Sequence, residues 1–171
     1  FYSEVISRDP TNALAYAYLS QVVSGELLME PADPEKSLTD ATTYAHKSLR
    51  CDPYCQEGHL ALATSLLFKG NFAEAVATLE QGARLNERSS DYRASMGALL
   101  IYMGFYDRGK EILDSAFQQT PELTWWHVLA FSFHSFMKDR YQDAIFWADR
   151  IEMSVEQIPL IRGASFAYLD E

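Results

Sequence analysis

The sequence repeats itself with a period of 34 residues, and this period constrains the fold more than any other feature. Pro53, Glu87 and Pro121 are spaced 34 residues apart, and each is the last residue of a similar segment. The three segments are residues 48–53, 82–87 and 116–121. A fixed period of this length is typical of stacked helical hairpins, in which each hairpin buries one face on its neighbour. The period therefore predicts a protein with a binding surface rather than one with an active site.

Apolar and small residues inside each period fall at helical spacing. His59, Leu62, Ala63 and Leu66 follow the i, i+3, i+4, i+7 pattern of one helix face. Gly70 then breaks this helix. A second helix follows and carries Phe72, Ala75, Leu79 and Gly82. The next period repeats the pattern with Arg93, Met96, Gly97, Leu100, Gly104, Tyr106, Gly109, Leu113 and Ala116. Small residues recur where paired helices are expected to cross, because only a short side chain lets two backbones approach closely.

We therefore predict an all-α fold, a right-handed superhelical solenoid of antiparallel helix hairpins. The whole chain, 1–171, is expected to be a single domain with about four full repeats and partial repeats at both ends. In chain order, the segments are the second helix of a preceding repeat, four full repeats and the first helix of a following repeat: 1–9, 12–52, 55–86, 89–120, 123–154 and 157–171.

Two repeats depart from the period. Pro10 and Pro53 are 43 residues apart, nine more than the period, and the surplus is expected at about 25–36. Pro31 and Pro34 fall in that segment and are expected to interrupt the helix. In the last full repeat, Tyr141 and the alanine three residues later come one residue late, which predicts a slightly longer first helix or turn.

Composition excludes several classes of partner. The chain carries 24 acidic and 14 basic residues, and its formal net charge is −10. Contact with nucleic-acid phosphates or with an anionic membrane surface is therefore not expected. No apolar run is long enough to span a bilayer. Two cysteines do not make a disulfide framework, which favours a cytoplasmic setting. The chain has no initiator Met and opens inside an expected helix, so a piece of a longer protein is expected.

The repeat pattern resembles that of tetratricopeptide repeat (TPR) proteins along nearly the whole chain. More narrowly, it resembles the TPR tails of bacterial class III adenylate cyclases and of winged-helix transcriptional regulators. The resemblance is carried by residues 9–16, the Pro-containing insertion, 45–53, 70–75, Pro121 with Trp125 and Trp126, and 140–144. It implies an interaction or sensory module that regulates an attached signalling or transcription domain.

In TPR proteins the first helices line a concave groove, which implies a peptide-binding surface here. The groove positions carried by the resemblance are Leu60, Thr64, Phe68, Ala94, Ala98, Tyr102, Trp125, Val128, Ser132 and Phe136. These residues are mostly apolar, and aromatic side chains commonly anchor interfaces. TPR domains that grip acidic C-terminal tails use a clamp of Lys, Asn and Arg. Here that clamp is replaced by Leu60, Ala61, Thr64, Ala94 and Ser95, so such a partner is not expected.

One cluster could in principle hold a metal ion. His46, Cys51, Cys55 and His59 lie within 14 residues and are soft zinc ligands by type. Their spacing matches no common zinc motif, and Cys51 falls where the next repeat has Leu85. A packing role therefore outweighs metal binding, and no cofactor is expected.

Two other histidines could act as a catalytic base. His127 and His134 share one helix face, but both occupy positions where the pattern expects a bulky packing residue. No nucleophile elbow, phosphate-binding glycine loop or metal-binding histidine pair is present. An active site in this chain is therefore not expected.

The expected function is non-catalytic recognition of a peptide or helix in the concave groove. An alternative is a homo-oligomerisation scaffold in which a terminal repeat, with Phe166 and Tyr168, stacks on another copy. A metal or ligand sensor that uses the histidines ranks behind both.

Overall fold

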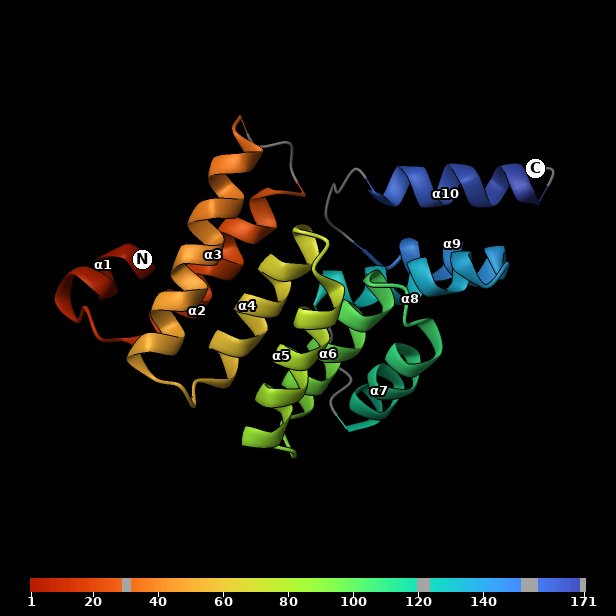
Figure 1. Cartoon of the computed structure of the whole chain (residues 1–171). Coiled ribbons are helices and arrows are strands. Elements are labelled where there is room, and N and C mark those ends of the chain that lie inside the picture. The colour runs from red at the N-terminus through yellow and green to blue at the C-terminus, as the bar shows by residue number, and fades with distance from the viewer. Residues whose placement is uncertain (29–31, 120–123, 152–156, 170–171) are drawn as a thin grey trace. The chain divides into compact units, whose positions relative to one another are not determined.

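The computed structural model describes residues 1–28, 32–119, 124–151 and 157–169, and Figure 1 shows them as helices joined by turns. Within these residues there are ten α-helices and no strand, which confirms the all-α prediction. The helices are α1 (Tyr2–Arg8), α2 (Ala13–Glu26), α3 (Pro34–Cys51), α4 (Gln56–Phe68), α5 (Phe72–Leu85), α6 (Ser90–Tyr102), α7 (Tyr106–Gln119), α8 (Trp125–Met137), α9 (Tyr141–Ala148) and α10 (Gln157–Tyr168).

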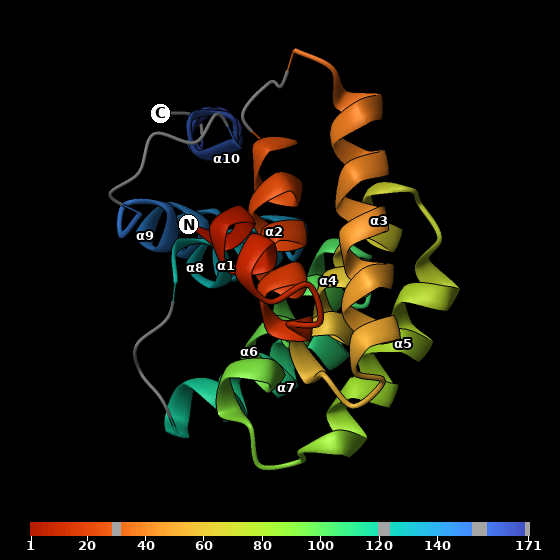
Figure 2. The same cartoon turned by 90° about the vertical axis from the view of Figure 1, so that its left-hand side faces the viewer.

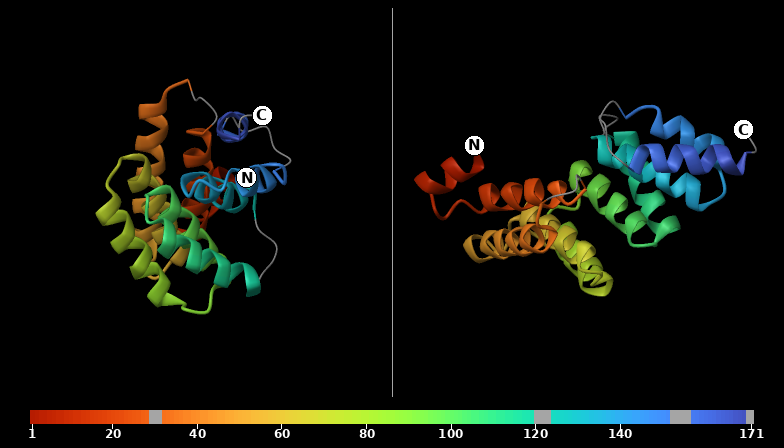
Figure 3. Two further views of the ribbon diagram at one scale, coloured as in Figure 1. Left: turned by 90° about the vertical axis from the view of Figure 1, so that its right-hand side faces the viewer. Right: turned by 90° about the horizontal axis from the view of Figure 1, so that it is seen from above.

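The chain forms two compact units, Phe1–Tyr92 and Arg93–Glu171, with the boundary inside α6. In the first unit, α1 packs on α2, α2 packs on α3 and α4, and α4 also contacts α3 and α5 (Figure 2). In the second unit, α8 contacts α7 and α9, and α10 lies against both α8 and α9 (Figure 3). Each of these contacts joins helices that are neighbours, or next but one, in the chain. The single-domain and superhelix predictions remain predictions.

The same turn ends three helices. Gly70, Gly104 and Asp139 follow α4, α6 and α8, respectively. Their φ angles are 74°, 90° and 57°, which lie in the left-handed region. In each turn the N–H of this residue donates to the carbonyl three residues back, and the next N–H donates to the carbonyl five back, at 2.9–3.1 Å. This is the Schellman motif, which satisfies helix carbonyls that would otherwise lack partners. The three turns are 34 and 35 residues apart, so the sequence period is also a structural period.

A second turn recurs ahead of the first helices. The side chains of Asp9, Asp52 and Asn86 each accept a hydrogen bond from the backbone N–H two residues later, with Oδ1···N distances of 3.0, 2.9 and 3.2 Å. Asp and Asn close such turns because their short side chains imitate a backbone acceptor. These residues open the loops before α2, α4 and α6, and the three loops have the same length. The helices on either side therefore keep the same register.

Small residues occur where the two helices of each hairpin approach each other. The pairs are Ser20 with Ala41, Ala63 with Ala75, Gly97 with Gly109, and Ser132 with Ala144, and all eight residues are buried. We call the first member of each pair the crossing residue of its helix.

Contacts at three of these pairs show how close the approach is. The Oγ of Ser20 donates to the carbonyl of Ala41 at 2.7 Å, and Ser132 does the same to Ala144 at 2.7 Å. A Cβ added to Gly97 would lie 2.8 Å from the carbonyl oxygen of Gly109, and the reverse distance is 2.7 Å. The backbones are thus too close for a side chain at the glycine pair.

The insertion in the first full repeat differs from its prediction in one respect. Pro34 does not interrupt a helix but opens α3, where the missing N–H of proline is tolerated. Asp33 caps this helix by accepting the N–H of Lys36 at 3.0 Å. α3 has 18 residues, whereas α5 and α7 have 14, so part of the surplus lengthens the second helix. Pro31 lies outside the described residues.

Tyr141 and Ala144 in the last full repeat come one residue later than the period expects, and the reason differs from the one predicted. α4, α6 and α8 all have 13 residues, and the turns after them are equally long. The extra residue therefore falls between Gln119 and Trp125, not in the first helix or its turn. As a result, every residue of α8 corresponds to the residue 35 positions earlier in α6. Pro121 lies outside the described residues.

Replacing Gly109 with alanine tests the crossing. The new Cβ would meet backbone, which cannot move aside easily, so we expect Gly109→Ala to destabilise the chain by about 1–3 kcal/mol through overpacking. This loss would appear even though alanine favours a helix over glycine by about 1 kcal/mol. Urea unfolding followed by circular dichroism would measure the change.

Gly163 in α10 is the matched control, because a Cβ there meets nothing within 4 Å. Gly163→Ala should leave stability unchanged or raise it by up to about 1 kcal/mol. Equal effects of the two substitutions would contradict a close crossing at Gly109.

Candidate functional site

The predicted groove residues of the first unit lie on α4. Leu60 is buried, whereas Thr64 and Phe68 are half-buried. The hydroxyl of Thr64 donates to the carbonyl of Leu60 at 2.9 Å, within the same helix. Phe68 is therefore the predicted groove residue of this unit that has a partly exposed aromatic side chain.

In α6, the predicted residues belong largely to the core of the second unit. Ala94 and Ala98 are buried and pack in a cluster with Leu113 and Phe131. Tyr102 is half-buried, and its hydroxyl donates to the carbonyl of Trp126 at 2.6 Å, which joins α6 to α8. Burial raises the pKa of this phenol above its usual range. Tyr102 thus has a structural role, because it links α6 to α8, whether or not it also contacts a ligand.

In α8, the extra residue before the helix shifts the register of the predicted set by one. Ser132 is fully buried and is the crossing residue, so it corresponds to Gly97 and not to Ala98. Trp125, Val128 and Phe136 are half-buried and pack around Leu129, Ala144 and Ile161. In the corrected register, the α8 residues equivalent to Leu60, Thr64 and Phe68 are Leu129, Phe133 and Met137.

Exposed apolar side chains of the second unit lie at one of these three positions and on α10. Met137 is 42% exposed, Leu160 is 71% exposed and Tyr168 is 64% exposed. The ring of Tyr168 stacks on Tyr141 with centroids 4.8 Å apart and meets Phe136 edge-on at 6.1 Å. We call Met137, Leu160 and Tyr168 the apolar patch. Sequence reasoning missed Met137 because of the register shift, and it missed Leu160 although the weak charge of α10 was a visible signal.

His127 is a buried structural residue that joins α6 to the start of α8. Its Nδ1 accepts the backbone N–H of Thr124 at 3.3 Å and lies 2.9 Å from the hydroxyl of that residue. Its Nε2 lies 3.2 Å from the Oγ of Ser95. We assign the proton of the neutral ring to Nε2, because Nδ1 faces a backbone donor. Burial lowers the pKa of His127 to about 4.

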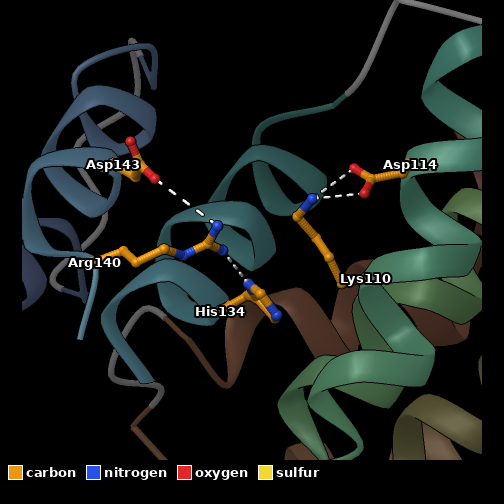
Figure 4. Close-up of polar contacts among 5 residues, drawn as sticks. All are labelled: Lys110, Asp114, His134, Arg140 and Asp143. Carbon is orange, nitrogen blue, oxygen red and sulfur yellow. Dashed lines mark hydrogen bonds and ion pairs between the residues drawn. The ribbon is translucent and has the colours of Figure 1, made fainter. Parts of the chain in front are cut away.

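His134 lies in a group of paired charges (Figure 4). Its Nδ1 accepts from Arg140 at 3.1 Å, and Arg140 also lies 3.9 Å from Asp143. Burial lowers the pKa of His134, and the neighbouring cations Arg140, Lys110 and Lys138 lower it further. The neutral form of the His134 imidazole is therefore favoured over the protonated form next to these three cations.

Each of these cations has a carboxylate partner. Lys110 contacts both oxygens of Asp114 at 2.7 and 2.6 Å, and Lys138 contacts Asp107 at 2.6 Å. These pairs are partly exposed and contribute little to stability. They balance the local charge, so the group offers no strong anion site.

The predicted cysteine and histidine cluster does not converge. Cys51 is exposed and Cys55 is buried, and both are free thiols. The Nε2 of His59 lies 3.1 Å from the carbonyl of Pro53. Among the described residues, no three His, Cys, Asp or Glu side chains are placed to hold a metal ion.

A hollow of about 460 Å³ opens in the first unit between the start of α3 and the end of α4. It is lined by Asp33, Glu35, Lys36, Leu38, Thr39 and Lys69, none of which is a predicted groove residue. Lys36 is paired with Asp40. The lining lacks a nucleophile next to a base, so its chemistry does not suggest catalysis.

The sequence matches no protein-family model, and a search of curated proteins finds no match either. Among the described residues, no helix is both long and apolar enough to cross a membrane. The candidate site thus depends on the geometry of this chain alone.

The acid sensitivity of folding tests the structural role of His127. An unfolded chain protonates this imidazole near pH 6.5, whereas the folded chain does so only near pH 4. Stability should therefore be complete above about pH 6.5, fall as the pH drops toward about 4, and change no further below that. The loss from this one group is on the order of 3 kcal/mol.

The comparison is with His127→Gln, whose amide oxygen can still accept the N–H of Thr124 but does not titrate. Free energies of unfolding at about pH 7.5 and about pH 4.5 should differ more in the natural chain than in the variant. His134 titrates in both proteins, so its contribution cancels. Equal pH dependence would show that His127 is not buried in its neutral form.

Proposed function

We propose that this chain is a TPR-type array whose function is non-catalytic recognition of a protein segment. The observation that carries the proposal is the recurrence of one hairpin, with the same left-handed turn and the same small-residue crossing, at spacings of 34 and 35 residues. Arrays of this kind present extended surfaces built from successive repeats. A right-handed superhelix, cytoplasmic location and an attached signalling or transcription domain are parts of the proposal that come from the family resemblance.

The chemistry of the first-helix surfaces supports binding over catalysis. Among the described residues, the two buried histidines are held by structural hydrogen bonds, and the charges around His134 are paired. By contrast, Met137 at a groove position and Leu160 and Tyr168 on α10 expose apolar area. Exposed apolar area of this kind usually marks a contact site.

The partner that fits best is an amphipathic helix or an extended peptide with apolar anchors. α8 contains no Asp, Glu, Lys or Arg, and α10 carries Arg162 as its one charged side chain. A ligand rich in acidic groups would find no cation on these two helices except Arg162, which lies 3.3 Å from Asp149. Apolar side chains would instead be covered by the apolar patch and by Phe136.

Substitution of the apolar patch tests this proposal. Peptides selected on the immobilised chain from a random library should be enriched in apolar and aromatic residues. The double variant Met137→Ser with Leu160→Ser should weaken their binding by about 2 kcal/mol or more, measured by titration calorimetry. Both side chains are exposed, so helix content should not change.

The matched control is Leu85→Ser with Phe146→Ser, which removes exposed apolar area from α5 and α9, the second helices. This variant should bind the selected peptides as the natural chain does. Selected peptides that bind both double variants equally well, and as tightly as the natural chain, would refute the groove assignment.

A further inference from the structure

Basic residues are divided unevenly between the first and the second helices of the hairpins. The first helices α2, α4 and α8 contain no Lys or Arg, and α6 and α10 contain one each, Arg93 and Arg162. The second helices α3, α5 and α7 carry Lys36, Lys47, Arg50, Arg84, Arg108 and Lys110. The first helices are therefore poor in positive charge.

The two cations of the first helices are engaged on the side of the second helices. The Nη2 of Arg93 donates to the Oγ of Ser115, which belongs to α7, at 3.3 Å. The Nε of Arg162 lies 3.3 Å from a carboxylate oxygen of Asp149, which directly follows α9. Neither guanidinium group therefore supplies an unengaged cation to the first-helix surface.

Two acidic residues of the first unit lie at the same position of successive first helices. Glu57 is the second residue of α4, and Asp91 is the second residue of α6. Glu57 is half-buried and Asp91 is exposed. Among the described residues, the ion pairs of this chain include neither carboxylate. We call Glu57 and Asp91 the acidic pair.

Both carboxylates act on the surface of α2. Tyr18 belongs to α2, which packs on α4, and it is half-buried. Burial raises the pKa of the Tyr18 phenol, and the negative charge of Glu57 and, to a smaller degree, of Asp91 raises it further. Charges on two successive first helices thus reach one phenol on a third. Their combined negative potential lies beside α2 and α4, the two helices that contain no Lys or Arg.

Helix stability alone does not account for this charge distribution. An acidic residue in the first turn favours any helix, because it faces the positive end of the helix dipole. Glu35, Glu74 and Asp107 take that place in α3, α5 and α7. Those three helices also carry basic residues, whereas α4 does not. The dipole therefore explains the acidic residue in the first turn but not the lack of a cation on the same helix.

We infer that the protein segment bound by the first helices is basic, with a Lys or Arg side chain of the segment against the acidic pair. This inference rests on the proposed function and specifies the charge of its partner. Complementary charge fixes the register of a partner and speeds its association. The net charge of −10 would in addition repel an acidic segment.

The length of α4 sets the spacing that such a segment needs. Phe68, the half-buried aromatic residue at the end of α4, follows Glu57 by eleven positions, which is about 16 Å along the helix axis. An extended peptide covers this distance in about five residues, and a helix in about eleven. A basic residue and an apolar anchor should therefore be separated by one of these two spacings.

Peptides selected from a random library on the immobilised chain provide the probe. They should contain more Lys and Arg than Asp and Glu next to their apolar residues. The double variant Glu57→Gln with Asp91→Asn should bind the tightest of these peptides about three- to tenfold more weakly in dilute salt, measured by titration calorimetry. The difference should nearly vanish at about 1 M salt, where the Debye length is about 3 Å.

Two controls separate this contact from a general effect of charge or folding. Glu35→Gln with Glu74→Gln removes the same charge from exposed first-turn positions of α3 and α5, and this variant should bind as the natural chain does. A copy of the peptide with Gln in place of each Lys and Arg should bind the natural chain and the Glu57→Gln, Asp91→Asn variant equally well.

The outcomes distinguish this inference from the proposed function. Selected peptides that are apolar but not basic would overturn the inference and leave the proposed function in place. Equal binding of a basic peptide to the natural chain and to the Glu57→Gln, Asp91→Asn variant would do the same, as would equal weakening by the control variant. Failure to select any apolar peptide would refute the proposed function and this inference together.

Discussion

The close crossing of two helices at a pair of small residues is the constraint on which the rest of this structure depends. At Gly97 and Gly109 each backbone lies so near the other that a Cβ would come within 3 Å of a carbonyl oxygen. At Ser20 and Ser132 the approach is close enough for a side-chain hydroxyl to bond the facing carbonyl. Apolar residues on either side of the crossing can then pack tightly, because the distance between the helices is set by the smallest side chains.

Several polar side chains that are buried in this fold join neighbouring helices. Gln56 donates to the carbonyls of Gly82 and Asn86 at the end of α5, and Tyr92 donates to Leu79 at 3.0 Å. His127 connects Ser95 to the start of α8 in the same way. Each of these contacts satisfies a group that would be costly to bury alone. One of the two histidines considered as a catalytic base, His127, is therefore explained by packing and hydrogen bonding.

Much of the helix pattern could be predicted from the sequence, because apolar spacing and turn residues act locally. In the 55–86 segment, α4 and α5 lie on either side of the break expected at Gly70, and a glycine is recognisable by residue type. The register of α8 could not be predicted, because periodicity shows that a residue has been added but not where. The turn at Asp139, which is not glycine, gave no clear signal either. Pro34 was misread because proline opens a helix as readily as it ends one.

The groove residues were harder to predict than the helices. Exposure depends on what covers a side chain: Ala98 has the right spacing but is buried, whereas Ser132 is the buried crossing residue of α8. Leu160 and Tyr168 are exposed because, in the described part of their unit, the helices that contact α10 are α8 and α9, and these two cover its other side. Residue spacing within one helix therefore predicts which side chains are exposed only when the helices that pack on it are also known.

The restriction of helix contacts to near neighbours in the chain has a consequence for how this protein reaches its native state. Within each unit, the contacts that build the core close only short stretches of chain, such as α4 on α5 or α8 on α9. Short closures cost little entropy, and chains with local contacts fold quickly. Nucleation need not begin at one privileged place, since any single hairpin can form first and serve as the template on which the adjoining ones assemble.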